Sequence, residues 1–150
     1  RSVSRGLGDV YKRQEVAPEG AIEFFHGYTY SGHPLACAAG LATLEVYREE
    51  DLFARAAELA PYFQEAVHSL ADCKNVIDVR NLGLMGAIEL ESIEGRPTVR
   101  AMEAFQKAFE RGLLVRTTGD TIALSPPLIV ERKHIDFIAE TVRDVIETVH

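Results

Sequence analysis

The stretch HGYTYSGHPLACAAGLATLEVYREEDL, residues 26–52, decides how the chain is organised. Its first nine residues contain two glycines and a proline, which is typical of a structured loop. Pro34 occupies the position that favours the first turn of a helix, so a helix is predicted to begin there. Residues 35–47 are apolar on nearly every side of that helix, which predicts a helix that is buried all round. Such a helix needs a covering surface from another domain or another subunit.

Upstream of this stretch, residues 1–14 differ in charge from the rest of the chain. They hold four basic residues and one acidic residue, whereas the remaining 136 residues hold 12 basic and 22 acidic residues. The segment also has no helical or strand periodicity. We therefore expect residues 1–14 to be a non-native leader and exclude them from the fold. The alternative is a natural basic tail.

Downstream, hydrophobic periodicity predicts two helices separated by a pair of strands. Asp51 is expected to cap the first of these helices, which carries apolar residues at helical spacing and contains Pro61, where a kink is expected. Residues 75–80 and 84–91 are predicted strands, with a bend or bulge at Gly83 and Gly86. The even-numbered residues from Leu84 to Leu90 then share one face by the strand period of two.

The C-terminal part repeats the alternation of helix and strands. Pro97 is expected to start a helix that ends at Gly112, and residues 113–117 and 121–125 are expected to form a hairpin. A final helix is predicted over residues 131–149, with an apolar stripe on one side. The order of elements predicts an α+β fold in which helices pack on one face of a small, mostly antiparallel sheet.

Composition excludes several classes of protein. The chain has 150 residues, of which 47% are hydrophobic and 26% charged, which is the balance of one globular domain. The longest apolar stretch is too short for a membrane span, and the net charge of −7 argues against a nucleic-acid binder. Cys37 and Cys73 form neither a disulfide framework nor a zinc motif, so a cytoplasmic setting is expected.

The loop before the apolar helix is the part of the chain where residues of several chemistries gather. His26 and His33 flank the loop, but two histidines are too few for a metal site. Hydrogen bonding within the loop is the better interpretation of these two histidines. Thr29 offers a hydroxyl, and the glycines allow backbone N–H groups to point one way beside a helix N-terminus. That combination suits a phosphate, although many loops before helices contain threonine and glycine without binding one.

Residues 26–52 resemble the cofactor loop and following helix of the class III aminotransferases, which use pyridoxal phosphate on the fold-type I scaffold. VRNLGLMGAIEL (79–90) resembles the strand pair of that family, and LLVRTTGDTIALSPPLIV (113–130) resembles its late hairpin. The similarity covers about residues 15–150. Within the family it is greatest to the β-alanine–pyruvate, or omega-amino acid, transaminases.

The resemblance implies roles for individual residues. Thr29 would donate a hydrogen bond to the cofactor phosphate across a homodimer interface, and Gly27, Tyr28 and Tyr30 would line the same loop. Arg116 would bind the substrate carboxylate, since a guanidinium offers a planar fork to it. From the residues alone, Arg116 is better interpreted as a charged residue at a hairpin tip, at the end of the strand that starts at Leu113.

The resemblance also implies a domain organisation and an activity. Residues 15–33 would end a large domain with the cofactor-phosphate loop, and residues 34–150 would form a bridging helix and the C-terminal small domain. The whole protein would move an amino group from an omega-amino acid or amine to a 2-oxo acid such as pyruvate by a ping-pong mechanism.

One family feature is not matched in this sequence. The family holds its cofactor on a lysine that precedes the loop, whereas the chain has only Lys12, Lys74, Lys107 and Lys133, none in that motif. We therefore expect the C-terminal part of a transaminase, truncated at its N-terminus and inactive alone, with no catalytic residue of its own. The alternative is a stand-alone, non-catalytic α+β binding module that derives from this family.

Overall fold

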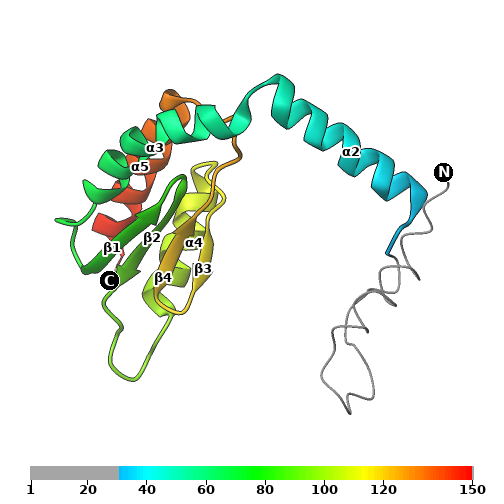
Figure 1. Cartoon of the computed structure of the whole chain (residues 1–150). Helices are drawn as coiled ribbons and strands as arrows, with labels where there is room; N and C mark the ends of the chain where they lie inside the picture. The colour runs from blue at the N-terminus through cyan, green and yellow to red at the C-terminus, as the bar shows by residue number, and fades with distance from the viewer. Residues whose placement is uncertain (1–30, 150) are drawn as a thin grey trace, which may run out of the picture. The chain divides into compact units, whose positions relative to one another are not determined.

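The computed structural model describes residues 31–149, drawn in colour in Figure 1. The chain divides into two compact units, residues 1–50 and residues 51–150. Each unit is described by itself. The second contains all the described strands and the whole described hydrophobic core.

The described part of the first unit is dominated by helix α2, Pro34–Glu49. Pro34 lies in its first turn as predicted, and the Nδ1 atom of His33 accepts a hydrogen bond from the N–H of Ala36 at 3.5 Å. None of its residues is buried. Burial of this helix by another surface stays a prediction.

The second unit is built on a four-stranded antiparallel sheet with the strand order β1-β2-β4-β3. Strand β1 is Val76–Leu82, β2 is Met85–Leu90, β3 is Arg116–Thr118 and β4 is Thr121–Leu124. The two sequence-adjacent hairpins therefore lie side by side, and β2 and β4 pair in the middle of the sheet.

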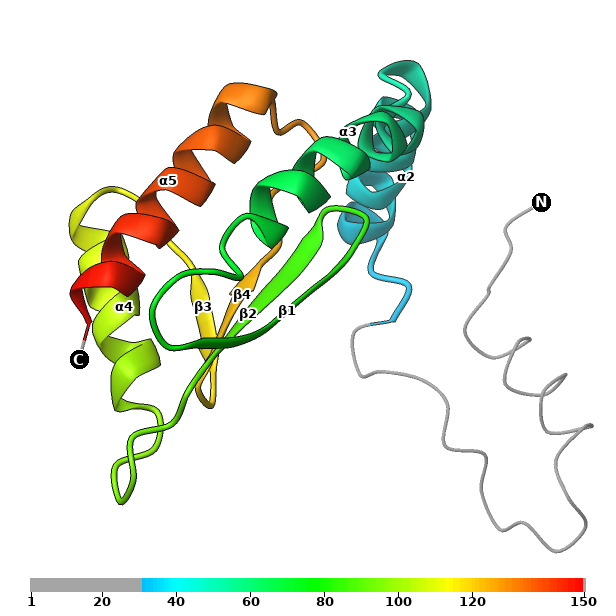
Figure 2. The ribbon, with the colours of Figure 1, turned by 90° about the vertical axis from the view of Figure 1, so that its left-hand side faces the viewer.

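Three helices cover one face of this sheet, as Figure 2 shows. Helix α3 is Leu52–His68, α4 is Val99–Glu110 and α5 is Arg132–Thr148. Helix α5 packs against both α3 and α4, while α3 contacts β1 and β2 and α4 contacts β3 and β4. The α+β fold with helices on one face of a small sheet is confirmed.

The core lies between the helices and the inner face of the sheet. The period-two pattern of β2 is confirmed, because Gly86, Ile88 and Leu90 are buried while Met85 is exposed. Gly86 is the point of closest approach: a Cβ atom there would lie 3.2 Å from Cε1 of Phe63, which is itself completely buried. The ring of Phe63 thus fits against strand β2 because that position lacks a side chain.

Turn geometry differs from the sequence-based expectation at two places. The register shift in the first hairpin lies between Val76 and Asp78 in β1, and not at the glycines; Gly83 instead forms the turn, with φ +57°. Asp51 precedes α3 in a left-handed conformation and makes no side-chain capping bond, so its predicted capping role was wrong.

The helix and strand near Arg116 also begin later than predicted. Helix α4 starts at Val99, because Thr98 before it adopts a left-handed conformation with φ 69°. Strand β3 starts at Arg116 and does not include Leu113. Extending the register of the hairpin would place Leu113 opposite Pro126, which has no N–H to donate to a sheet. Arg116 is thus the first residue of its strand.

The close contact at Gly86 yields a stability prediction for residues 51–150, which carry their own core. Gly86→Val should lower the free energy of unfolding by about 1–3 kcal/mol, because the new methyl groups must displace the ring of Phe63. The matched control is Ala87→Val, on the opposite face of the same strand, which should change stability by less than about 0.5 kcal/mol. Urea unfolding measures both, and equal losses would refute the packing argument.

Candidate functional site

The outer face of the sheet, opposite the helices, carries a row of four residues that crosses all four strands. Arg80 in β1 pairs with Ala87 in β2, Ala87 pairs with Ala123 in β4, and Ala123 pairs with Arg116 in β3. Since neighbouring strands lie about 4.8 Å apart, the two arginines are separated by about 14 Å along the row. The two residues between them, Ala87 and Ala123, have small side chains, so no long side chain stands between the two arginines in this row.

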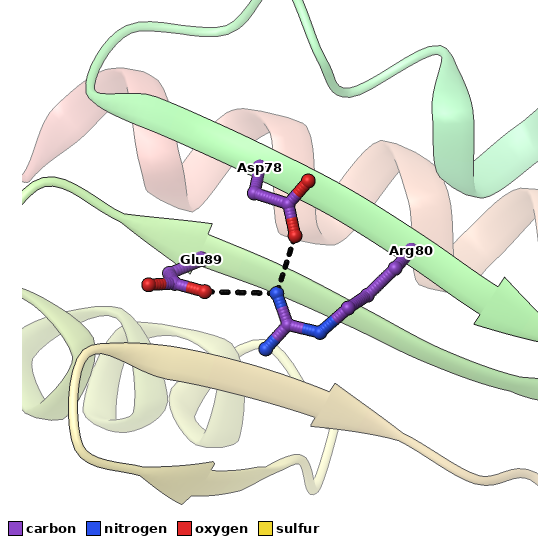
Figure 3. A network of polar contacts seen from close by, with 3 residues as sticks. All are labelled: Asp78, Arg80 and Glu89. Carbon is purple, nitrogen blue, oxygen red and sulfur yellow. Dashed lines mark hydrogen bonds and ion pairs between the residues drawn. The ribbon is translucent and has the colours of Figure 1, made fainter.

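At one end of the row, Arg80 is held by two carboxylates, as Figure 3 shows. Its Nη1 atom lies 2.5 Å from Oδ2 of Asp78 and 2.8 Å from Oε2 of Glu89. These hydrogen bonds raise the pKa of the Arg80 guanidinium above its ordinary value. The charge of Arg80 is therefore already compensated by its neighbours on β1 and β2.

At the other end, the side chain of Arg116 has no hydrogen bond or ion pair with any of the residues from 31 to 149, and it is exposed. It lines a cavity of about 540 Å³. The cavity wall is mostly apolar, with Phe105, Leu113 and Ile138 among its residues, and Thr117 and Ser125 add hydroxyl groups. Arg116 thus places at an apolar hollow a guanidinium that no residue of the described part of the chain holds, which is a suitable arrangement for binding a carboxylate.

The Arg116 hairpin is tied to the rest of the sheet at its turn. Gly119 has φ +60°, and the carboxylate of Asp120 accepts a hydrogen bond from the N–H of Thr98 at 2.8 Å. The backbone carbonyl of Asp120 accepts a second bond from the N–H of Leu90 at 2.9 Å. Sequence reasoning missed this role of Asp120; the available signal was an acidic residue beside a turn glycine.

The other sequence-based site residues lie outside the described residues. Gly27, Tyr28, Thr29 and Tyr30 all precede Ser31, where the description begins. Their proposed contact with a cofactor phosphate therefore stays a prediction. His33, at the edge of the same loop, acts as the cap of α2, which agrees with the hydrogen-bonding interpretation of that histidine.

The described lysines occupy helix surfaces and a loop. Nζ of Lys107 lies 2.8 Å from Oε1 of Glu103 and donates to the carbonyl of Thr148 at 2.7 Å. Lys133 is paired with Glu131 in the same way at 2.8 Å, which lowers the pKa of that carboxyl. Both amines are engaged with surface acceptors, which is a poor setting for an amine that must carry a carbonyl cofactor.

Within residues 31–149, no cluster of three or more histidine, cysteine, aspartate or glutamate side chains could hold a metal ion. In the same part of the chain, no helix combines the length and the apolar character that crossing a membrane requires.

Comparison with known proteins assigns the family. The family model described as aminotransferase class-III matches residues 7–146, which is nearly the whole chain. The chain belongs to the class III aminotransferase family. The resemblance carried by residues 26–52, 79–90 and 113–130 is thereby confirmed.

Individual relatives agree with this family. The chain is 63% identical over 139 residues to an omega-aminotransferase of Caulobacter vibrioides, which covers 93% of the chain and 32% of that protein. It is 43% identical over 143 residues to a β-alanine–pyruvate aminotransferase of Pseudomonas aeruginosa, covering 95% of the chain and 32% of that protein. The chain thus spans about a third of the length of these relatives.

A solved structure supports the fold. The crystal structure of an amine transaminase from an uncultivated Pseudomonas species, in its pyridoxal-phosphate-bound form, superposes with a TM-score of 0.75 at 34% identity. The superposition covers 85% of this chain and 30% of that one. The small sheet with its helices is therefore similar to part of a cofactor-bound transaminase.

Proposed function

We propose that this chain is the C-terminal part of a pyridoxal-phosphate-dependent aminotransferase that moves an amino group from an omega-amino acid or amine to a 2-oxo acid such as pyruvate. The observation that carries the proposal is Arg116, whose guanidinium lies at the apolar hollow with no partner among residues 31–149. Both the donor omega-amino acid and the acceptor 2-oxo acid carry a carboxylate that needs a cationic partner. The names of the relatives, omega-aminotransferase and β-alanine–pyruvate aminotransferase, support this substrate class.

Arg116 suits this role for two physical reasons. Its guanidinium presents parallel N–H donors to both oxygens of a carboxylate, and the apolar wall of the hollow weakens competition from water. Because no neighbour within the described residues holds it, its long side chain can turn toward a carboxylate and away from an apolar group. One pocket could then accept both substrates of the ping-pong cycle.

The cofactor would supply the electron sink for transferring the amino group when it is bound. Thr29 would hold the cofactor phosphate through its hydroxyl, with Gly27 and Tyr28 in the same loop, in a homodimer. The lysines at 74, 107 and 133 lie on helix surfaces or in a loop, so we expect these 150 residues alone to transfer no amino group.

The full-length protein is proposed to act in the cytoplasm as a homodimer. Cys37 and Cys73 are both free thiols, which suits a reducing compartment. Helix α2 leaves Leu35, Leu41 and Leu44 exposed by 74%, 64% and 62%, an apolar surface of the kind that a large domain or a partner subunit covers.

The role of Thr29 can be measured in the full-length protein. Thr29→Ala should weaken cofactor binding about tenfold to hundredfold, because one hydrogen bond to a charged group contributes about 1.5–3 kcal/mol. Cofactor affinity is measured by equilibrium titration of the folded apoenzyme, with Thr29→Ser as the control that keeps the hydroxyl. A lower melting temperature with unchanged affinity would show that Thr29 only stabilises its loop.

The role of Arg116 is tested by comparing substrates with and without a carboxylate. In the full-length protein, Arg116→Ala should lower kcat/KM for an amino acid donor about tenfold to hundredfold, since a charged hydrogen-bonded pair is lost. A plain amine donor should be affected far less when its half-reaction is measured alone. Arg116→Lys should restore only part of the loss, because it offers a point charge and no fork.

The test of Arg116 has a matched control. Arg80→Ala serves as that control, since Arg80 lies in the same row but is already paired with Asp78 and Glu89. It should not discriminate between the two donors. Equal losses for amino acid and amine in the Arg116 variant would mean that Arg116 is structural.

A further inference from the structure

We propose that Asp120 is the positioning residue that holds the Arg116 hairpin in place for carboxylate binding. The proposal rests on the function proposed for Arg116 and adds a residue that acts through it. Asp120 lies in the turn between β3 and β4, and its two acceptor groups bind two different elements. Nothing about the turn sequence itself requires either bond.

The first bond joins the hairpin to helix α4. The Oδ1 atom of Asp120 accepts from the N–H of Thr98 at 2.8 Å, and Thr98 is the residue that precedes the first turn of α4. Thr98 makes no capping bond with its own side chain, and the first turn of α4 contains no acidic residue. The carboxylate of Asp120 therefore serves as a remote cap, at the helix end where the dipole favours a negative charge.

The backbone conformation of Thr98 is unfavourable for its residue type, so it needs support from a neighbouring group. Thr98 is β-branched and has φ 69°, a conformation that such residues rarely adopt. That conformation carries a cost, which the hydrogen bond from its N–H to Asp120 offsets. Figure 2 shows the β3–β4 turn and the start of α4 at the same end of the sheet.

The second bond joins the turn to the centre of the sheet. The carbonyl of Asp120 accepts from the N–H of Leu90, the last residue of β2, at 2.9 Å. On the other side of the loop that follows β2, the buried Arg100 donates to the carbonyl of Glu91. The turn is therefore fixed to β2 and α4 together.

Arg116 depends on this anchor because its own strand is weak. Strand β3 has three residues, lies at the edge of the sheet and pairs only with β4. So short an edge strand has little independent stability. One end of the segment is held by the buried Val115, and the other end is held by the turn at Asp120. Loosening the turn leaves Arg116 fixed on one side only.

The experiment uses the full-length holoenzyme and single-turnover half-reactions, so that a carboxylate-bearing acceptor does not mask the donor. The probes are β-alanine and a plain arylalkyl amine. Asp120→Ala should weaken binding of β-alanine about tenfold, because displacing a substrate-binding group by about 1 Å has effects of this size or larger. The amine should change less than twofold.

Asp120→Asn is the decisive comparison, because its amide oxygen can still accept from Thr98 while the charge is lost. It should bind β-alanine within about twofold of the wild type. Glu94→Ala is the matched control: Glu94 lies in the loop before α4 and has no hydrogen bond or ion pair with residues 31–149. If Asp120→Ala does not fold, Asp120→Glu replaces it in the experiment. Its longer side chain shifts the turn, so it should weaken binding of β-alanine selectively, but by less than the loss expected for Asp120→Ala.

Three results for the Asp120 variants would overturn the proposal, and one result for Arg116→Ala would overturn it together with the proposed function. One is an equal loss for β-alanine and the amine, which would assign Asp120 a general structural role. Another is a loss in Asp120→Asn as large as in Asp120→Ala, which would make the charge responsible. The third is no selective loss in Asp120→Ala when Arg116→Ala shows one; the function of Arg116 then stands and the role of Asp120 falls. No selective loss in Arg116→Ala would overturn both.

Discussion

The covering of the sheet on one face only is the constraint on which the rest of the second unit depends. Phe63 packs against β2 at Gly86, and the alternation of the strands then sends every second residue to the opposite face. A shift of one residue would bury Glu89 and expose Ile88, so the register is strongly specified. The outer row from Arg80 to Arg116 is a consequence of how the inner face packs.

The two arginines at the ends of that row show how neighbours decide what a charge can do. Arg80 donates to two carboxylates, so an incoming anion would have to displace or join groups that already carry negative charge. Arg116 lines an apolar hollow, and its guanidinium has no partner among residues 31–149 that a ligand would have to displace. Exposed ion pairs such as that of Arg80 add little stability, so its pairing matters more for selectivity between the two sites than for the fold.

Periodicity and turn chemistry in the sequence were sufficient to predict the helices, the strands and the one-sided sheet. Arg116 was found through its resemblance to a family, because spacing alone makes it a charged hairpin residue. Asp120 could not be found in this way, since its partner Thr98 lies 22 residues away and adopts a backbone conformation that its residue type disfavours. The predicted start of β3 at Leu113 was wrong, because a run of apolar residues does not show where pairing with the neighbouring strand ends.

The two units differ in what makes them stable. Residues 51–150 bury a set of large side chains of their own, whereas α2 buries none among the described residues. Most of the stability of helices in proteins comes from packing of an apolar face, and α2 leaves three leucines exposed. Each leucine would contribute about 1.5–3 kcal/mol if it were buried. Burial of these leucines by a large domain or a partner subunit, the cover expected for α2, would therefore supply stability that this helix does not have by itself.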